Sequence, residues 1–145
     1  MISPTIPPIN LDQPLLRILI VDDSLEVRHD LRQLLELSGL VVVVGEGSDG
    51  QEALQLVESL LPDVVVMDME MPVMNGAEAT RHIKKDLHAL RVVILSVHNS
   101  PDVLDLARET GADSFVTKGA GYEILLNAIL GMDGSNILFT KGDGL

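Results

Sequence analysis

Two adjacent carboxylates close the first apolar run of the chain. Residues 18–24 are ILIVDDS, so four apolar residues lead directly into Asp22 and Asp23. Two ionised acids side by side repel each other, and burial pushes one of them towards its neutral form. A bound cation removes this conflict, so a divalent metal site is the first chemistry that these residues suggest.

Other polar residues end the later apolar runs. Asp68 ends the run PDVVVMD, Ser96 lies near the end of RVVILSV, and Lys118 ends DSFVTK. If these runs are parallel strands, their carboxyl ends meet at the edge of the sheet where ligands bind in such folds. Three carboxylates at that edge suit Mg²⁺, which keeps water and phosphate oxygens beside its protein ligands. A carboxylate there can also attack a phosphoryl donor, while Ser96 hydrogen-bonds the phosphate and Lys118 pairs with its charge.

The alternation of apolar runs and helical patterns predicts the elements that position these residues. Nearly continuous apolar runs rich in β-branched residues are typical of buried parallel strands, and short links favour right-handed crossovers. We therefore expect one α/β domain, with a doubly wound (βα)5 sheet between two layers of helices. The expected strands are 15–22, 40–46, 62–68, 91–97 and 113–118. The expected helices are 24–38, 49–60, 76–87, 101–110 and 120–131.

Small polar residues indicate where these helices begin. Ser24 fits the N-cap of the first helix, because its hydroxyl can accept a hydrogen bond from the first turn, and Gly39 fits the stop. Asp49, Asn75 and Ser100 stand before three of the later helical patterns.

Composition limits the classes of partner. The chain has 145 residues, an apolar content of 46%, no cysteine and a formal net charge of −12. This charge argues against direct binding to nucleic acid or to anionic membranes, because both need clustered Lys and Arg. The absence of cysteine excludes disulfides and thiolate zinc sites, and no apolar run approaches the roughly 20 residues that span a bilayer. We expect a cytoplasmic protein whose partners are proteins or cations.

Four segments, ILIVDDS, VVVMDMEMPVMNG, ILSV and GADSFVTK, resemble the signature segments of bacterial response-regulator receiver domains, the CheY-like domains of two-component signalling. The resemblance covers residues 15–131. It implies a flavodoxin-like fold with the strand order 2-1-3-4-5. The sequence KGA, which begins at Lys118, resembles receivers attached to output domains of the LuxR and NarL kind.

The resemblance also assigns the phosphoryl chemistry to particular residues. It implies that Asp68 accepts a phosphoryl group from the phosphohistidine of a sensor histidine kinase. It implies that Asp22 and Asp23 help to bind Mg²⁺, Asp23 directly. The other implied ligands are the carboxylate of Asp68 and the backbone carbonyl of Glu70. The domain would then be a signalling switch, not an enzyme that turns over small substrates.

The resemblance further implies a conformational switch. Ser96 and Phe115 would form a hydroxyl and aromatic pair, with Lys118 as the counter-charge of the phosphate. Alternation along the strand leaves Phe115 open to either a core or a switch role. The chain departs from the family pattern at Gly119, where proline is common, so the bend after Lys118 must arise differently.

Other functional classes fit parts of the pattern. A pseudo-receiver keeps the fold as an interaction module without being phosphorylated, although the intact acids and Lys118 argue against it. A phosphohydrolase of the haloacid dehalogenase type also has an aspartate nucleophile after a strand. It needs a second aspartate two residues later, where Glu70 stands. His82 and His98 leave a phosphohistidine role open, although lone histidines at such positions are more often structural or exposed.

The two ends of the sequence are expected to lie outside the domain. Residues 1–14 are rich in proline and indicate an extended or flexible leader. Residues 132–145 indicate a tail or the start of a linker, so we expect either a stand-alone receiver or part of a longer regulator. The expected downstream partner is an effector or output domain, and a homodimer formed on phosphorylation is a further expectation.

Overall fold

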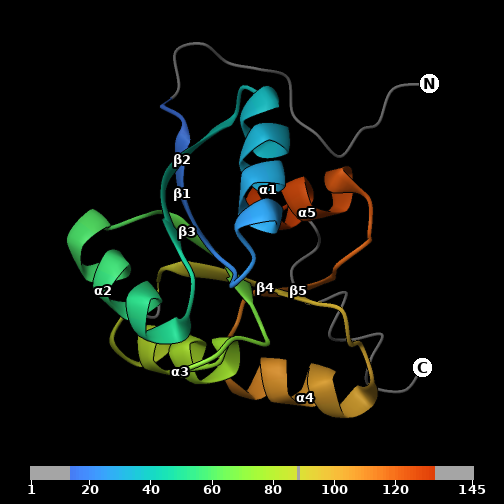
Figure 1. The fold of residues 1–145 in the computed structure, drawn as a ribbon. Coiled ribbons are helices and arrows are strands. Elements are labelled where there is room, and N and C mark those ends of the chain that lie inside the picture. Colours follow the sequence, from blue (N-terminus) through green and yellow to red (C-terminus); the bar gives the residue numbers. More distant parts are fainter. Residues whose placement is uncertain (1–13, 88, 133–145) are drawn as a thin grey trace.

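The computed structural model describes residues 14–87 and 89–132, which form a parallel sheet between two layers of helices (Figure 1). Most of the predicted leader, residues 1–14, and of the predicted tail, residues 132–145, lies outside the described residues. No helix in the described part of the chain is long and apolar enough to cross a bilayer. The strands are β1 (Leu16–Val21), β2 (Val41–Gly47), β3 (Val64–Asp68), β4 (Arg91–Ser96) and β5 (Ser114–Thr117).

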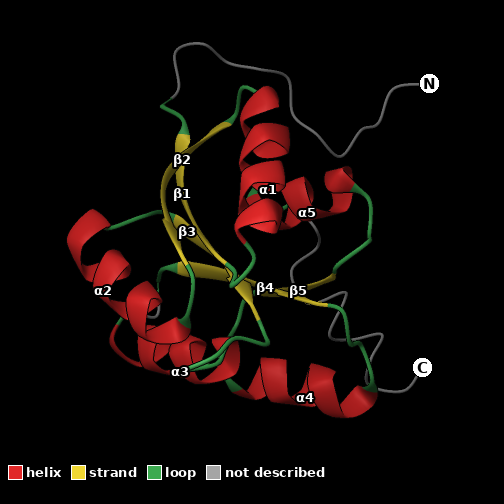
Figure 2. Cartoon of the chain, in the orientation of Figure 1, coloured by secondary structure: helices red, strands yellow, loops and turns green. Residues whose placement is uncertain are grey.

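The helices lie on both faces of the sheet, as expected for a doubly wound fold. α1 and α5 cover one face and α2, α3 and α4 cover the other (Figure 2). A parallel connection needs a crossover over one face, which α1, α2, α3 and α4 supply, whereas α5 follows the last strand. The helices are α1 (Leu25–Leu37), α2 (Gly50–Leu60), α3 (Gly76–Asp86), α4 (Pro101–Glu109) and α5 (Tyr122–Ile129).

The strand order is β2-β1-β3-β4-β5, and every pair is parallel. Both the predicted fold class and the predicted order are confirmed. The chain runs outwards from β1 to β2 and then returns to the other side of β1 to form β3. The direction of winding therefore reverses between β1 and β3, and the carboxyl ends of these two strands flank the crevice where ligands bind in such sheets.

Each face of the sheet has its own apolar core. Successive side chains of a strand point to opposite faces, so Val65 and Met67 pack towards α2, α3 and α4, whereas Val64 and Val66 pack towards α1 and α5. All four side chains are buried. Burial on both faces explains why the sequence of β3 is continuously apolar rather than alternating.

The predicted helix caps are confirmed. The side chains of Ser24, Asp49, Asn75 and Ser100 each accept a hydrogen bond from a backbone N–H in the first turn of the helix that follows. Gly39 adopts a left-handed φ of 74° just after α1, which suits the residue that ends a helix.

The last helix is shorter than the predicted 120–131, because a turn occupies its expected first residues. The N–H of Ala120 donates to the carbonyl of Thr117 at 3.0 Å, and Gly119 between them has φ +95°. A left-handed residue at the third position of a four-residue turn favours glycine. Gly119 therefore makes the bend after Lys118 without proline, and all peptide bonds of the described residues are trans.

Candidate functional site

Three carboxylates meet at the carboxyl ends of β1 and β3. Asp22, Asp23 and Asp68 each offer an oxygen within 4.8 Å of the other two. Asp22 and Asp68 are buried, with 1% and 3% exposure, whereas Asp23 is exposed. Hard oxygen ligands with one side open to solvent fit Mg²⁺, which retains several water ligands and binds phosphate oxygens.

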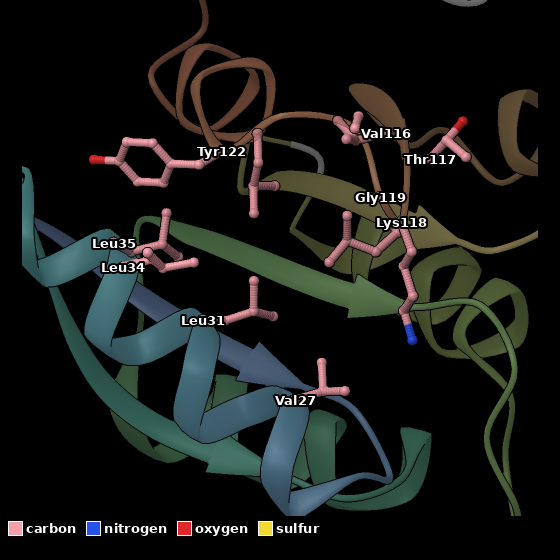
Figure 3. A pocket seen from close by; sticks show the side chains of 12 residues that line it. Val27, Leu31, Leu34, Leu35, Val116, Thr117, Lys118, Gly119 and Tyr122 are labelled. Carbon is pink, nitrogen blue, oxygen red and sulfur yellow. The ribbon is translucent and has the colours of Figure 1, made fainter.

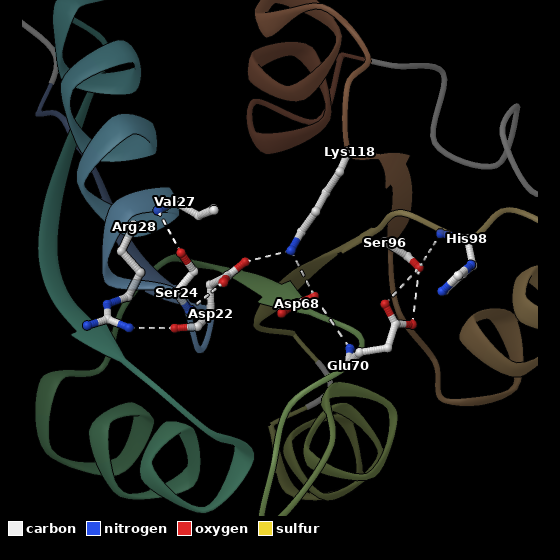
Figure 4. Close-up of polar contacts among 9 residues, drawn as sticks. All are labelled: Asp22, Ser24, Val27, Arg28, Asp68, Glu70, Ser96, His98 and Lys118. Atoms are coloured by element: carbon white, nitrogen blue, oxygen red, sulfur yellow. Dashed lines mark hydrogen bonds and ion pairs between the residues drawn. The ribbon is translucent and has the colours of Figure 1, made fainter.

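Lys118 faces the buried acids from the end of β5. Its Nζ lies 2.8 Å from Oδ2 of Asp22 and 3.1 Å from Oδ1 of Asp68 (Figure 4). Burial alone would lower the pKa of Lys118, but its hydrogen bond to Asp22 and the charges of both acids outweigh burial and raise that pKa. Lys118 therefore stays cationic beside the acids at neutral pH.

Asp68 carries the largest pKa perturbation of the site. Burial and then the nearby charge of Asp22 raise its pKa from 3.8 to about 6, while Lys118 and the N–H of Glu70 act in the opposite direction. The metal-free site therefore holds more negative charge than Lys118 balances. A cation that enters the cluster relieves this imbalance.

Strand alternation explains why Asp22, Asp68 and Lys118 converge. Each lies two positions after a core residue that packs towards α1 and α5, so alternation directs all three side chains to the same side of the sheet. Those core residues are Ile20, Val66 and Val116.

The loop between β3 and α3 packs tightly around Asp68. The N–H of Glu70 lies 3.4 Å from Oδ1 of Asp68, and the N–H of Gly76 donates to the carbonyl of Met69 at 2.9 Å. A Cβ on Gly76 would collide with the backbone carbonyl of Asp68. The first residue of α3 must therefore be glycine for the helix to approach the end of β3 this closely.

Ser96 lies at the end of β4, and its hydroxyl contacts Glu70 and the backbone of His98. The Oγ of Ser96 is 3.3 Å from Oε2 of Glu70 and accepts a hydrogen bond from the N–H of His98 at 3.0 Å (Figure 4). Ser96 is fully buried, whereas Glu70 is exposed. Sequence reasoning considered only the backbone carbonyl of Glu70 and missed this contact of its carboxylate.

Phe115 is buried in the core on the same face of the sheet as Ser96. It pairs in register with Ile94, and Thr117 pairs with Ser96, so Phe115 lies diagonally behind Ser96. This position suits a core residue and also permits the predicted coupling to Ser96, which stays a prediction. His82 is exposed on α3, and His98 is exposed and contributes a backbone N–H.

An apolar cavity of about 260 Å³ adjoins the site between α1 and α5. Figure 3 shows Val27 and Leu31 of α1 facing the segment that carries Lys118. The side chain of Lys118 runs along the cavity wall, with its nitrogen at the acids. The cavity lining contains no carboxylate. The carboxylates that could hold a metal therefore lie in the acid cluster and not in the cavity lining.

The fold and the site together define the class of protein. A (βα)5 sheet that places an acid cluster and a lysine at its switch point is the arrangement of a phosphoryl-accepting signalling domain. A family model described as "Response regulator receiver domain" matches residues 18–130, and the chain belongs to this family. It is the receiver domain of a two-component response regulator, and the predicted resemblance is confirmed.

The similar proteins are regulators of the NarL and LuxR kind. The chain is 36% identical over 112 residues to the nitrate/nitrite response regulator NarL of Escherichia coli K12, covering 77% of this chain and 52% of NarL. It is 37% identical over 116 residues to the response regulator GacA of Pseudomonas aeruginosa, covering 79% and 54%. The chain thus spans about half the length of the curated relatives it matches.

Solved structures give the same result. The signal receiver domain of the NarL regulator from Mycobacterium tuberculosis superposes with a TM-score of 0.79 at 33% identity, covering 84% of this chain and 98% of that one. The CheX–CheY–BeF3–Mg complex from Borrelia burgdorferi matches with a TM-score of 0.77 at 25% identity, covering 85% and 93%.

Proposed function

We propose that this receiver domain accepts a phosphoryl group on Asp68 from the phosphohistidine of a sensor histidine kinase, in the presence of Mg²⁺. One observation supports this proposal above the others. Asp68 is buried at a strand end, within reach of two further carboxylates, and is paired with Lys118. No other aspartate in the described part of the chain is paired with Lys118 except Asp22, which belongs to the same cluster.

The chemistry is a single transfer. An ionised oxygen of Asp68 forms a bond to phosphorus while the phosphorus–nitrogen bond of the phosphohistidine breaks, and the released imidazole takes up a proton from water. Asp22, Asp23, Asp68 and the carbonyl of Glu70 would hold Mg²⁺. When bound, the metal neutralises charge on the transferred group. Lys118 keeps its charge throughout and pairs with a phosphoryl oxygen.

Lys118 also links the two buried acids before transfer. It bonds both Asp22 and Asp68, so it holds the acceptor oxygen in place while the acids repel each other. After transfer the new group carries additional negative charge, and the ammonium can remain with it because no proton needs to move. Lys118 therefore pairs with the acids in the unphosphorylated domain and with the phosphoryl group in the phosphorylated domain.

Phosphorylation would switch the conformation through Ser96 and Phe115. In the unphosphorylated domain the hydroxyl of Ser96 bonds the carboxylate of Glu70. A phosphoryl group on Asp68 offers stronger acceptor oxygens and repels the carboxylate of Glu70, so Ser96 turns towards it. Phe115, diagonally behind Ser96, then moves into the space that Ser96 leaves.

The proposed partners are a sensor histidine kinase and an output domain or effector. The match covers only about half of each relative, so an output domain of the LuxR and NarL kind in the same regulator is one proposal. A formal net charge of −12 indicates that DNA contacts would come from that output domain and not from this receiver. Homodimer formation on phosphorylation and a cytoplasmic location complete the proposal.

Intact-mass measurement after incubation with acetyl phosphate and Mg²⁺ tests the proposal. The expected result is the addition of one phosphoryl group, which is lost when EDTA replaces Mg²⁺. An unmodified mass under conditions in which the protein is folded would contradict it, and would instead support a pseudo-receiver that acts only as an interaction module.

A further inference from the structure

The pairing of β1 with β2 contains a bulge that turns the side chain of Glu46 to the opposite face of the sheet. Ile18 pairs with Val43, but the next residue, Leu19, pairs with Gly45, so Val44 is the extra residue of a bulge. Such an insertion changes which side chains point to which face. Glu46 is therefore directed towards α1 rather than α2.

The neighbours of β2 agree with this reversal. Val41 and Val43, before the bulge, pack in the core shared with α1 and α5. A Cβ on Gly45 or Gly47, after the bulge, would instead meet leucine side chains of α2. Glu46, between these glycines, faces α1, where two arginines lie one turn apart.

Those two arginines bind the same carboxylate but differ in one further contact. Nε of Arg28 lies 3.0 Å from Oε1 of Glu46, and Nε of Arg32 lies 2.9 Å from Oε2. Arg28 also donates from Nη1 to the backbone carbonyl of Asp22 at 2.6 Å (Figure 4). The Arg28 side chain is 14% exposed, and that of Arg32 is 36% exposed. Only Arg28 connects Glu46 to the acid cluster.

The carbonyl of Asp22 belongs to the peptide plane that joins Asp22 to Asp23. The N–H of Asp22 donates to the carbonyl of Gly47 at 3.0 Å, so β2 holds one side of Asp22 and Arg28 holds the other. Asp23 is exposed, and its carboxylate makes no hydrogen bond or ion pair within the described residues. The backbone therefore sets the direction of the Cα–Cβ bond of Asp23, from which its carboxylate reaches the cluster.

We propose that Arg28, held by Glu46, is a positioning residue for the metal ligands: it fixes the Asp22–Asp23 peptide plane so that the Asp23 carboxylate points into the acid cluster. This inference rests on the proposed Mg²⁺ site. It assigns a function to the bulge as well, because without the bulge Glu46 would face away from Arg28. Sequence reasoning missed Arg28, although it lies one helical turn after the Ser24 cap, on the side of α1 nearest the acids.

The test compares Arg28→Met with Arg32→Met. Both variants keep an apolar stem and remove one guanidinium from Glu46, but only Arg28→Met frees the carbonyl of Asp22. Two quantities are measured on each folded protein: the amide NMR signals of residues 22–24 without metal, and the Kd for Mg²⁺ from titration. We expect Arg28→Met to shift those signals and to raise Kd about tenfold, in the range known for residues that orient metal ligands. Arg32→Met should leave both unchanged.

Electrostatics alone predicts the opposite change in the Kd for Mg²⁺. Removing a positive charge near an acid cluster strengthens its attraction for a cation, so a lower Kd for Arg28→Met would overturn the inference. Equal changes of Kd and of the NMR signals in both variants would also overturn the inference. Arg28 and Arg32 would then only connect α1 to β2 through Glu46.

Wild-type behaviour separates this inference from the proposed function. If wild type binds Mg²⁺ and Arg28→Met binds equally well, the positioning role is wrong and the proposed function stands. If wild type does not bind Mg²⁺, both are wrong. If Arg28→Met does not fold, Arg28→Lys and Arg32→Lys give the same comparison, because a single ammonium lacks the fork that reaches two acceptors at once.

Discussion

Replacing Asp68 by asparagine should stabilise the metal-free protein, although it removes the proposed phosphoryl acceptor. Asparagine keeps the shape of the side chain and can still accept a hydrogen bond from Lys118. It removes the charge that burial and the nearby Asp22 make unfavourable. Lys118 keeps its ion pair with Asp22, so the substitution does not leave Lys118 unpaired.

The magnitude follows from the pKa of Asp68. A rise from 3.8 to about 6 means that the folded protein binds the proton more tightly than the unfolded chain does. The free energy of unfolding of the wild type therefore falls as pH rises from about 4 to 6 and is constant, for this group, above that window. Each unit of pKa difference is worth about 1.36 kcal/mol, so ionisation of Asp68 costs roughly 3 kcal/mol at neutral pH. For a domain of this size that corresponds to roughly 10 °C in Tm.

Thermal and urea unfolding in EDTA, at pH 4 and at pH 7.5, measures this effect. Asp68→Asn should exceed wild type clearly at pH 7.5 and match it near pH 4, and saturating Mg²⁺ should narrow the difference by stabilising only the wild type. Asp30→Asn, which removes one charge from an exposed position on α1, is the matched control and should show little change. An Asp68→Asn protein that is less stable than wild type at pH 7.5 in EDTA would refute the reasoning, as would a gain of the same size at both pH values.

Three further perturbations test other parts of the site. Mg²⁺ should stabilise the wild type by about 2.7 kcal/mol at a hundredfold excess over Kd. Asp23→Ala should abolish most of this gain, as measured by thermal unfolding. An unchanged Tm of the wild type with saturating Mg²⁺ would contradict the proposed metal site. Ser96→Ala should still be phosphorylated. It should lose most of the amide NMR shifts that a beryllofluoride mimic produces around residues 96–118. Full retention of those shifts would exclude Ser96 as the coupling residue. Gly76→Ala should lower the free energy of unfolding by about 1–3 kcal/mol, because the added methyl group overpacks against Asp68. Urea unfolding measures this change. An unchanged free energy of unfolding would show that α3 can move away from β3 without cost.

Local signals in the sequence were sufficient for the alternation of strands and helices, for the helix caps and for the acids. Ser24 and Asn75 stand directly before helices, and a cap acts within one turn, so no distant contact is needed to recognise it. Asp22 and Asp68 end apolar runs, and parallel strands bring such ends to one edge. The strand order came from the family resemblance, since the residues alone do not specify which strands are neighbours.

Features that depend on contacts between elements were not predicted. The bulge at Val44 is a matter of register between β1 and β2, and the run of valines there has no local mark of it. The contact of Arg28 with the carbonyl of Asp22 depends on how α1 packs against β2. The late start of α5 depends on the turn at Gly119, which the alternation of apolar residues does not reveal. The carboxylate of Glu70 meets Ser96 only because the loop after β3 folds back towards β4.

Locating the phosphoryl group tests the central claim most directly. Wild type and Asp68→Asn are incubated with a phosphoryl donor and Mg²⁺, the acyl phosphate is trapped with borohydride, and the modified residue is identified by tandem mass spectrometry. The account predicts one modified residue, Asp68, in the wild type and none in Asp68→Asn. A modification that persists undiminished in Asp68→Asn, or one that maps to His82 or His98, would contradict it.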